Sequence, residues 1–217
     1  MTPLTELIIT SGNSDRILTA RQLHRLLAGG DARRYGLVNR ALKAGELLKA
    51  RRGLYVLAQV YRKTPLHPFV LAQHLVSGSY VSVESALSFH GWIPEAVHSV
   101  LSVTPKGKSV AYTHELLGKF EFCRMTVNVG YFFQAVTRHE FHQQAALVAE
   151  PVRALLDLVY TRKLPWQGLD FLWDGLRIDE SMIREVPAAD IAGLLAIYKG
   201  KREQVFINEL LRSLAND

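Results

Sequence analysis

The amino-acid sequence predicts an α+β protein in which a small module of helices and a hairpin precedes a mixed sheet and a run of helices. Three observations support this prediction. Apolar residues recur at helical spacing up to residue 45, alternate in short stretches further on, and return to helical spacing from Val152 onward. Strands followed by consecutive helices are typical of α+β rather than alternating α/β architecture.

The first residues predict a short helix over residues 4–10 and a better-marked one after it. Thr19 has the properties of an N-cap, and Gln22, three positions later, completes a capping-box pattern. A helix is therefore expected from Ala20 to about Ala28, where the glycines at 29 and 30 interrupt it.

A second helix is expected directly after this glycine turn. Asp31 is its predicted N-cap, and Gly45 is the expected left-handed residue at its end. Its apolar stripe follows a period of 3.6 residues and consists of Leu37, Val38, Ala41 and Leu42. Two helices separated by a tight turn that contains glycine have the spacing of a helix-turn-helix.

A basic hairpin is expected after these helices. Residues 47–50 and 54–57 are strand candidates on either side of Arg51, Arg52 and Gly53. Such a hairpin directly after a helix-turn-helix is a wing. Residues 1–62 are therefore predicted to form a winged helix-turn-helix domain.

The distribution of charge indicates a polyanionic partner for this domain. Residues 1–63 contain twelve basic and four acidic residues, a net charge of +8, whereas the remaining residues carry a net charge of −2. Charge asymmetry of this kind predicts nucleic-acid binding by the N-terminal part. The alternatives are a solvated basic surface without a partner and a module for packing, dimerisation or protein binding.

If the apolar stripe faces the core, the opposite face of the second helix presents basic and amide side chains. Arginine matches guanine and asparagine matches adenine in the major groove, while the arginines of the hairpin can reach phosphates or a minor groove. The orientation of Arg34 and Tyr35 near the helix start is left open. The candidate DNA-binding residues are Arg33, Arg34, Tyr35, Asn39, Arg40, Lys43, Arg51 and Arg52, with Gly36 permitting close approach.

Residues 58–66 are expected to be a linker and residues 67–217 a second α+β domain. Lys106, Gly107 and Lys108 are read as a solvated turn. Strands are predicted at 80–82, 100–104, 120–127, 131–135 and 145–149, and helices at 68–76, 84–90, 154–162, 169–176, 189–198 and 203–214.

Several stretches of the sequence resemble the AbiEi family of antitoxin-like transcriptional regulators. Residues 47–57 resemble the wing of that family, and residues 67–72, 80–87 and 90–95 resemble the signature of its second domain. Residues 149–160 are similar to the helix that opens its C-terminal part, except that Pro151, Val152 and Arg153 stand where an acidic-basic pair is common.

The resemblance implies a transcriptional regulator that represses its own operon through the winged helix. In the antitoxin members, the C-terminal domain counteracts a nucleotidyltransferase-type toxin. The partners implied are therefore duplex promoter DNA and a cognate toxin. An alternative is a protein-interaction module for which DNA binding is incidental. An enzyme with a winged-helix specificity domain, such as a nuclease, would need an acidic cluster that the sequence lacks.

No catalytic constellation, cofactor motif or metal site is predicted. His139 and His142 would share a helix face but have no third ligand, the single Cys123 has no partner, and His90 is read as a structural residue. A signal peptide and an apolar run long enough to span a membrane are also not found, so a cytoplasmic location is expected. The oligomeric state is left open, with a homodimer as one alternative.

Overall fold

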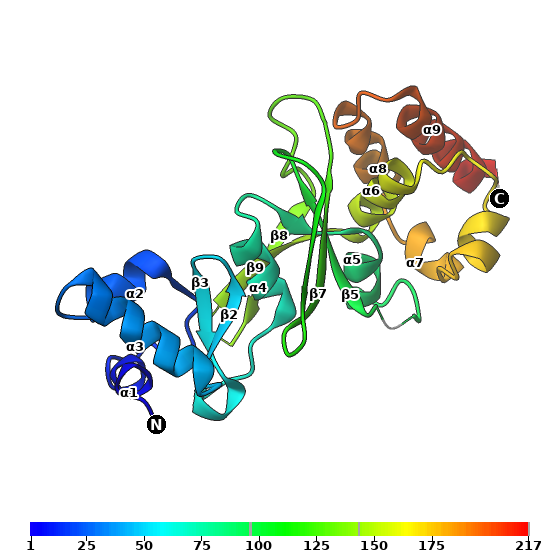
Figure 1. Cartoon of the computed structure of the whole chain (residues 1–217). Coiled ribbons are helices and arrows are strands. Elements are labelled where there is room, and N and C mark those ends of the chain that lie inside the picture. The colour runs from blue at the N-terminus through cyan, green and yellow to red at the C-terminus, as the bar shows by residue number, and fades with distance from the viewer. Residues whose placement is uncertain (96, 143, 217) are drawn as a thin grey trace. The chain divides into compact units, whose positions relative to one another are not determined.

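The computed structural model describes residues 1–95, 97–142 and 144–216 and has an α+β fold (Figure 1). N-terminal helices and a three-stranded sheet come first, followed by a mixed six-stranded sheet and C-terminal helices. The chain divides into two compact units. The first unit comprises residues 1–77 and 141–144, and the second comprises residues 78–140 and 145–217.

The helices at the start of the first unit form where the local signals predict them. They are α1 (Pro3–Thr10), α2 (Ala20–Leu26) and α3 (Asp31–Lys43). The capping box is confirmed, because the Gln22 backbone N–H donates to Thr19 Oγ1 at 3.2 Å and the Thr19 N–H donates to Gln22 Oε1 at 2.7 Å. These two bonds satisfy backbone donors that the first turn of α2 leaves free.

The start of α3 differs from the expectation by one residue. Gly30 is the N-cap, so the prediction that Asp31 caps this helix is wrong. Asp31 lies in the first turn instead, where a carboxylate still interacts favourably with the positive end of the helix dipole. The end of the helix is as predicted, since Gly45 follows it in the left-handed region with a φ of +67°. A residue with a side chain would adopt this φ less favourably than glycine does.

The predicted hairpin is confirmed and belongs to a three-stranded antiparallel sheet. Its strands are β1 (Leu18–Thr19), β2 (Leu47–Arg51) and β3 (Leu54–Leu57), in the order β1-β3-β2. Helices and sheet share one apolar core, formed by Leu4, Ile8, Leu18, Leu23, Leu27, Leu37, Ala41, Leu47 and Leu57.

Residues 58–66 are bound to the first unit and are not a free linker. They include a short 3₁₀ turn, η1 (Gln59–Tyr61), and a buried Arg62 that donates to the Asp15 carbonyl at 3.0 Å. The Asp15 carboxylate in turn accepts from the backbone N–H of Lys63 at 2.8 Å. Helix α4 (Pro68–Leu75) also belongs to this unit, which therefore extends past the boundary expected after Arg62.

The second unit contains a mixed sheet of six strands in the order β6-β7-β5-β4-β9-β8. Strand β5 runs parallel to β7 and β4 parallel to β9, while β4–β5 and β6–β7 are antiparallel. The strands are β4 (Tyr80–Val81), β5 (Ser99–Thr104), β6 (Val110–His114), β7 (Gly118–Arg124), β8 (Val136–Phe141) and β9 (Gln144–Ala149).

The edge strands β6 and β8 were not predicted from the sequence. Neither contains a buried residue, so neither needs the alternation of apolar and polar side chains that marks a half-buried strand. The inner strands β5, β7 and β9 do bury side chains and were predicted.

The helices of the second unit follow the prediction except in detail. Helix α7 (Glu180–Arg184) has five residues and was not predicted, since it is too short for a periodic pattern. The predicted helix at 169–176 is a π-helical turn, η2 (Phe171–Gly175). The others are α5 (Val83–Phe89), α6 (Pro151–Arg162), α8 (Ala188–Gly193) with η3 (Leu194–Ala196), and α9 (Lys201–Asn216).

A buried ion pair on α6 joins the parts of the second unit. The Arg153 Nε donates to Asp157 Oδ1 at 2.9 Å, and both side chains are 0% exposed. Asp157 also accepts from Tyr80 Oη at 2.8 Å and from Tyr198 Oη at 2.7 Å, and Ser82 Oγ donates to it at 2.7 Å. Burial, followed by the Asp157 charge, raises the pKa of both tyrosines well above its ordinary value, so both hydroxyls keep the proton that they donate.

The same arginine explains why the predicted strand at 131–135 is wrong. Arg153 Nη1 donates to the Gln134 carbonyl at 2.7 Å, and Nη2 donates to the Phe132 carbonyl at 3.3 Å. These carbonyls therefore accept from a guanidinium rather than from a neighbouring strand, and residues 131–135 form turns.

None of the helices in the described part of the chain has the length and apolar character that crossing a bilayer requires.

Asp157→Asn should destabilise the second unit by about 3–5 kcal/mol, because it leaves the Arg153 charge buried without a counter-charge. The matched control is Glu180→Gln, which breaks an exposed ion pair of the same i,i+4 spacing with Arg184. Its expected cost is about 0.5 kcal/mol or less. Urea unfolding followed by circular dichroism measures both, and equal losses would show that the Asp157 network does not hold the unit together.

Glu46→Gln should flatten the dependence of stability on pH below pH 4.5. The hydrogen bond from the Thr2 backbone N–H, 2.7 Å long, is the main cause that lowers the pKa of Glu46 from 4.5 to about 2. Because the folded pKa lies below the unfolded value, the ionised carboxylate stabilises the fold above pH 4.5, and this contribution is lost as the pH falls towards 2.

Urea midpoints measured at half-unit steps from pH 5 to pH 3 test this prediction. The exposed Glu6→Gln, also on the N-terminal unit, is the control and should reproduce the wild-type curve. A Glu46→Gln curve that stays parallel to the wild type over this range would contradict the assigned role of the carboxylate.

Candidate nucleic-acid interface

The first unit carries an excess of positive charge that its own acids barely neutralise. Residues 1–77 contain twelve basic and four acidic residues. Of these acids, Glu46 is buried and engaged by Thr2, and Asp31 contacts Arg34 at 3.4 Å. The exposed surface of the unit is therefore strongly basic.

The outer face of α3 is the first place where basic side chains gather. Leu37 and Ala41 are buried, which turns the opposite side of the helix to solvent. We refer to this side as the outer face; its members are Tyr35, Arg40 and Lys43, which are exposed, and Gly36 and Asn39, which are partly exposed. Arg33 is also exposed, but in the first turn and one turn before the buried Leu37. The open orientation of Tyr35 is thereby settled, since its side chain is 70% exposed.

Arg34 does not belong to the outer face. Its Nε donates to the Leu27 carbonyl at 3.1 Å, and its Nη1 donates to Asp31 Oδ1 at 3.4 Å. Leu27 is the C-cap residue of α2, so Arg34 joins the end of that helix to the start of the next. Among the candidates, Arg34 is therefore distinguished by a structural role, because its hydrogen bond to Leu27 connects the two helices across the α2–α3 turn.

The hairpin tip is the second place where basic side chains gather. Arg51 and Arg52 are both exposed, and Gly53 turns the chain with a φ of +79°. The Ala20 backbone N–H donates to the Gly53 carbonyl at 2.9 Å, which ties the tip to the start of α2. The β2–β3 register shifts between Lys49 and Arg51, an irregularity that re-aims side chains at the end of a strand.

No carboxylate neutralises these groups within the described part of the chain. None of the ion pairs found there includes Arg33, Arg40, Lys43, Arg51 or Arg52. The guanidinium and ammonium groups of both sites are available to an external anion.

Two basic residues near the hairpin tip were not among the candidates. Lys49 is exposed on β2 two residues before Arg51, and Arg21 is exposed directly after Ala20, which is bonded to the tip. The period of two along a strand could have indicated Lys49. The position of Arg21 depends on the pairing of β1 with β3, which no local pattern in the sequence shows.

The histidines considered as metal ligands lie on a strand and a turn, not on a helix. His139 belongs to β8, and His142 directly follows that strand. His90 bonds the Ala149 carbonyl through Nε2 at 2.9 Å, and burial lowers its pKa. Among the described residues, no group of three or more histidine, cysteine, aspartate or glutamate side chains could hold a metal ion.

Comparison with known proteins finds a similarity of fold to a solved structure. No protein-family model matches the chain, and no curated protein matches it. The crystal structure of the RV2827C protein from Mycobacterium tuberculosis is similar, with a TM-score of 0.66 and 15% sequence identity over 99% of this chain and 78% of that chain. At this level of identity, the similarity concerns the fold alone.

Arg34→Ala should lower the stability of the first unit by about 1–2 kcal/mol, since it removes the charged donor from the Leu27 carbonyl. The neighbouring Arg33→Ala removes an exposed side chain and should change stability by about 0.5 kcal/mol or less. The shift of the urea midpoint at constant m-value measures both. If the two variants unfold alike, Arg34 does not hold the α2–α3 turn.

Proposed function

We propose that the N-terminal unit is a winged helix-turn-helix domain that binds duplex DNA, and that the protein is a transcriptional regulator. The observation that carries this proposal is the outer face of α3, where unpaired basic side chains and an asparagine share one exposed side of a helix. The basic hairpin tip in the same unit supports it independently.

In this function α3 is the recognition helix. An α-helix with its side chains is about 10–12 Å across and fits a major groove about 12 Å wide. Arg33 and Arg40 carry the planar donors that match guanine, and Asn39 carries the amide that matches adenine. Lys43 contacts a phosphate, and Gly36 allows the helix backbone to approach the bases closely.

The hairpin tip is the wing. Arg51 and Arg52 bind phosphates beside the groove that α3 occupies and so contribute affinity rather than sequence preference. The bond between Ala20 and Gly53 supports this role, because it fixes the tip relative to the helix pair that carries the recognition helix. A wing that is held in place loses less conformational entropy on binding.

The resemblance to the AbiEi family extends the proposal to regulation of the protein's own operon. It also implies that the second unit counteracts a nucleotidyltransferase-type toxin encoded nearby. The partners are then operator DNA and that toxin, and the protein has no catalytic activity of its own. Reading the neighbouring gene tests the toxin part separately from DNA binding.

Replacing Arg51 and Arg52 together with alanine should weaken binding to all DNA sequences alike. Loss of two phosphate contacts should reduce the slope of log affinity against log salt concentration by about 2. The matched control replaces two exposed lysines, Lys106 and Lys108, with alanine. They flank a glycine turn in the second unit, and their loss should leave the slope unchanged. Fluorescence anisotropy of the full chain with its upstream DNA, at several salt concentrations, measures this effect.

The same titrations distinguish base reading from phosphate binding. Asn39→Ala should change the preference between operator variants by about 1–3 kcal/mol while keeping the salt slope. Unchanged preference and affinity would mean that the outer face of α3 does not enter the groove. Failure of the unaltered protein to bind its upstream region at moderate salt would overturn the proposed function itself.

A further inference from the structure

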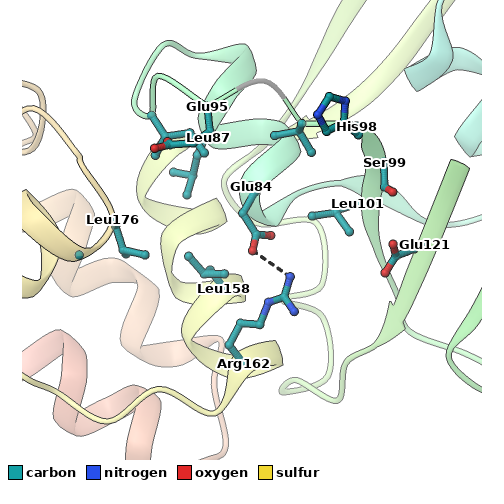
Figure 2. A pocket seen from close by; sticks show the side chains of 13 residues that line it. Glu84, Leu87, Glu95, His98, Ser99, Leu101, Glu121, Leu158, Arg162 and Leu176 are labelled. Carbon is teal, nitrogen blue, oxygen red and sulfur yellow. Dashed lines mark hydrogen bonds and ion pairs between the residues drawn. The ribbon is translucent and has the colours of Figure 1, made fainter. Parts of the chain in front are cut away.

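The second unit contains a pocket that DNA binding does not use. Figure 2 shows it bordered by α5, α6, β5 and β7, together with the connection from α5 to β5 and the residues that end η2. Its volume is about 520 Å³, within the range of about 300–1,000 Å³ that is typical of small-ligand sites. The pocket is therefore large enough for a small organic group.

One side of the pocket is aliphatic. Leu87 from α5, Leu101 from β5 and Leu158 from α6 point into it from three different elements (Figure 2). Leu176 closes the side towards η2. Leu87 and Leu158 are buried and form the base of this side, whereas Leu101 and Leu176 are partly exposed. A hydrocarbon chain that packs here removes the apolar surface of Leu101 and Leu176 from water.

The other side of the pocket carries more negative than positive charge. Glu84, Glu95 and Glu121 line it, whereas Arg162 is the one arginine or lysine among its described lining residues, which also include His98. Arg162 Nη2 is already engaged by Glu84 Oε1 at 3.0 Å. Glu95 likewise forms an ion pair at 3.0 Å with Arg177, which does not line the pocket.

On this side, one oxygen of Glu84 and the carboxylate of Glu121 are left without a partner in the part of the chain that the structure describes. Glu84 Oε2 is buried and has no hydrogen-bond partner among the described residues. Glu121 is exposed on β7 and forms no ion pair within the described part of the chain. Their charge is incompletely balanced, and the low polarity of the aliphatic wall strengthens its effect on a bound group.

The chemistry of the lining excludes two kinds of ligand. An anion would meet three carboxylates, and the lining arginine that could attract it is already engaged by Glu84. A metal ion would need several close ligands, and no such group of histidine, cysteine, aspartate or glutamate side chains occurs among the described residues. A ligand with a hydrocarbon part and a positive end fits both sides of the pocket.

We propose that this pocket binds an aliphatic cation, a guanidinium or ammonium group at the end of a short hydrocarbon chain. The chain packs on the partly exposed Leu101 and Leu176, and the cation lies against the acidic side, with Glu121 as its main counter-charge. Such a group occurs in free amines and in the arginine and lysine side chains of a partner protein. This inference is independent of the proposed DNA binding, which concerns the other unit.

Isothermal titration of the full-length protein tests the pocket. Agmatine represents a free cation, N-acetyl-arginine amide represents a protein side chain, and N-acetyl-citrulline amide is the neutral control of matched shape. We expect saturable binding of at least one cation, at least tenfold tighter than the citrulline compound. Tighter binding of agmatine points to a free amine as the source, and tighter binding of the capped arginine points to a partner protein.

Glu121→Gln should weaken binding of the preferred cation at least fivefold. The control is Glu115→Gln, an exposed glutamate between β6 and β7 that lies outside the pocket lining and should leave affinity unchanged. Thermal unfolding verifies that both variants fold. The proposal is overturned if neither cation binds at millimolar concentration, if the citrulline compound binds equally well, or if the two variants behave alike.

Discussion

The second unit depends on the burial of one carboxylate. A charge removed from water is tolerated only when counter-charge and hydrogen bonds replace its hydration. Asp157 obtains these from Arg153, one turn before it on α6, from Tyr80 on β4 and from Tyr198 before α9. Because each donor comes from a different part of the chain, satisfying Asp157 fixes a strand and the C-terminal helices against α6.

The first unit is stabilised in a different way, and the difference bears on its function. Its core is apolar, and its buried carboxylate Glu46 is held by the backbone N–H of Thr2 and the N-terminal ammonium rather than by an arginine or lysine side chain. Among the described residues of this unit, Arg34 is the one basic side chain that forms an ion pair. A surface of this kind has a favourable interaction with a polyanion without any loss of internal ion pairs.

Local signals in the sequence predicted much of the fold. The capping box at Thr19, the left-handed glycine at 45 and the basic hairpin around Gly53 act within a few residues, and each was confirmed. Where prediction failed, the deciding partner was distant in the sequence or the element was exposed. Residues 131–135 form turns because the guanidinium of Arg153 donates to two of their carbonyls. The edge strand β6 buries no residue, so its sequence lacks the apolar alternation that predicts a strand.

The sequence by itself determined the helices and hairpin of the first unit, its charge, and the exposed side of α3, since helical periodicity alone separates Leu37 and Ala41 from Arg40 and Lys43. Only the tertiary structure decided that Arg34 turns back towards Leu27 and that Glu84, Glu121 and Arg162 border one pocket. Periodicity specifies which side of an element a residue occupies. Which elements then meet depends on packing between segments far apart in the chain, and no local pattern encodes that.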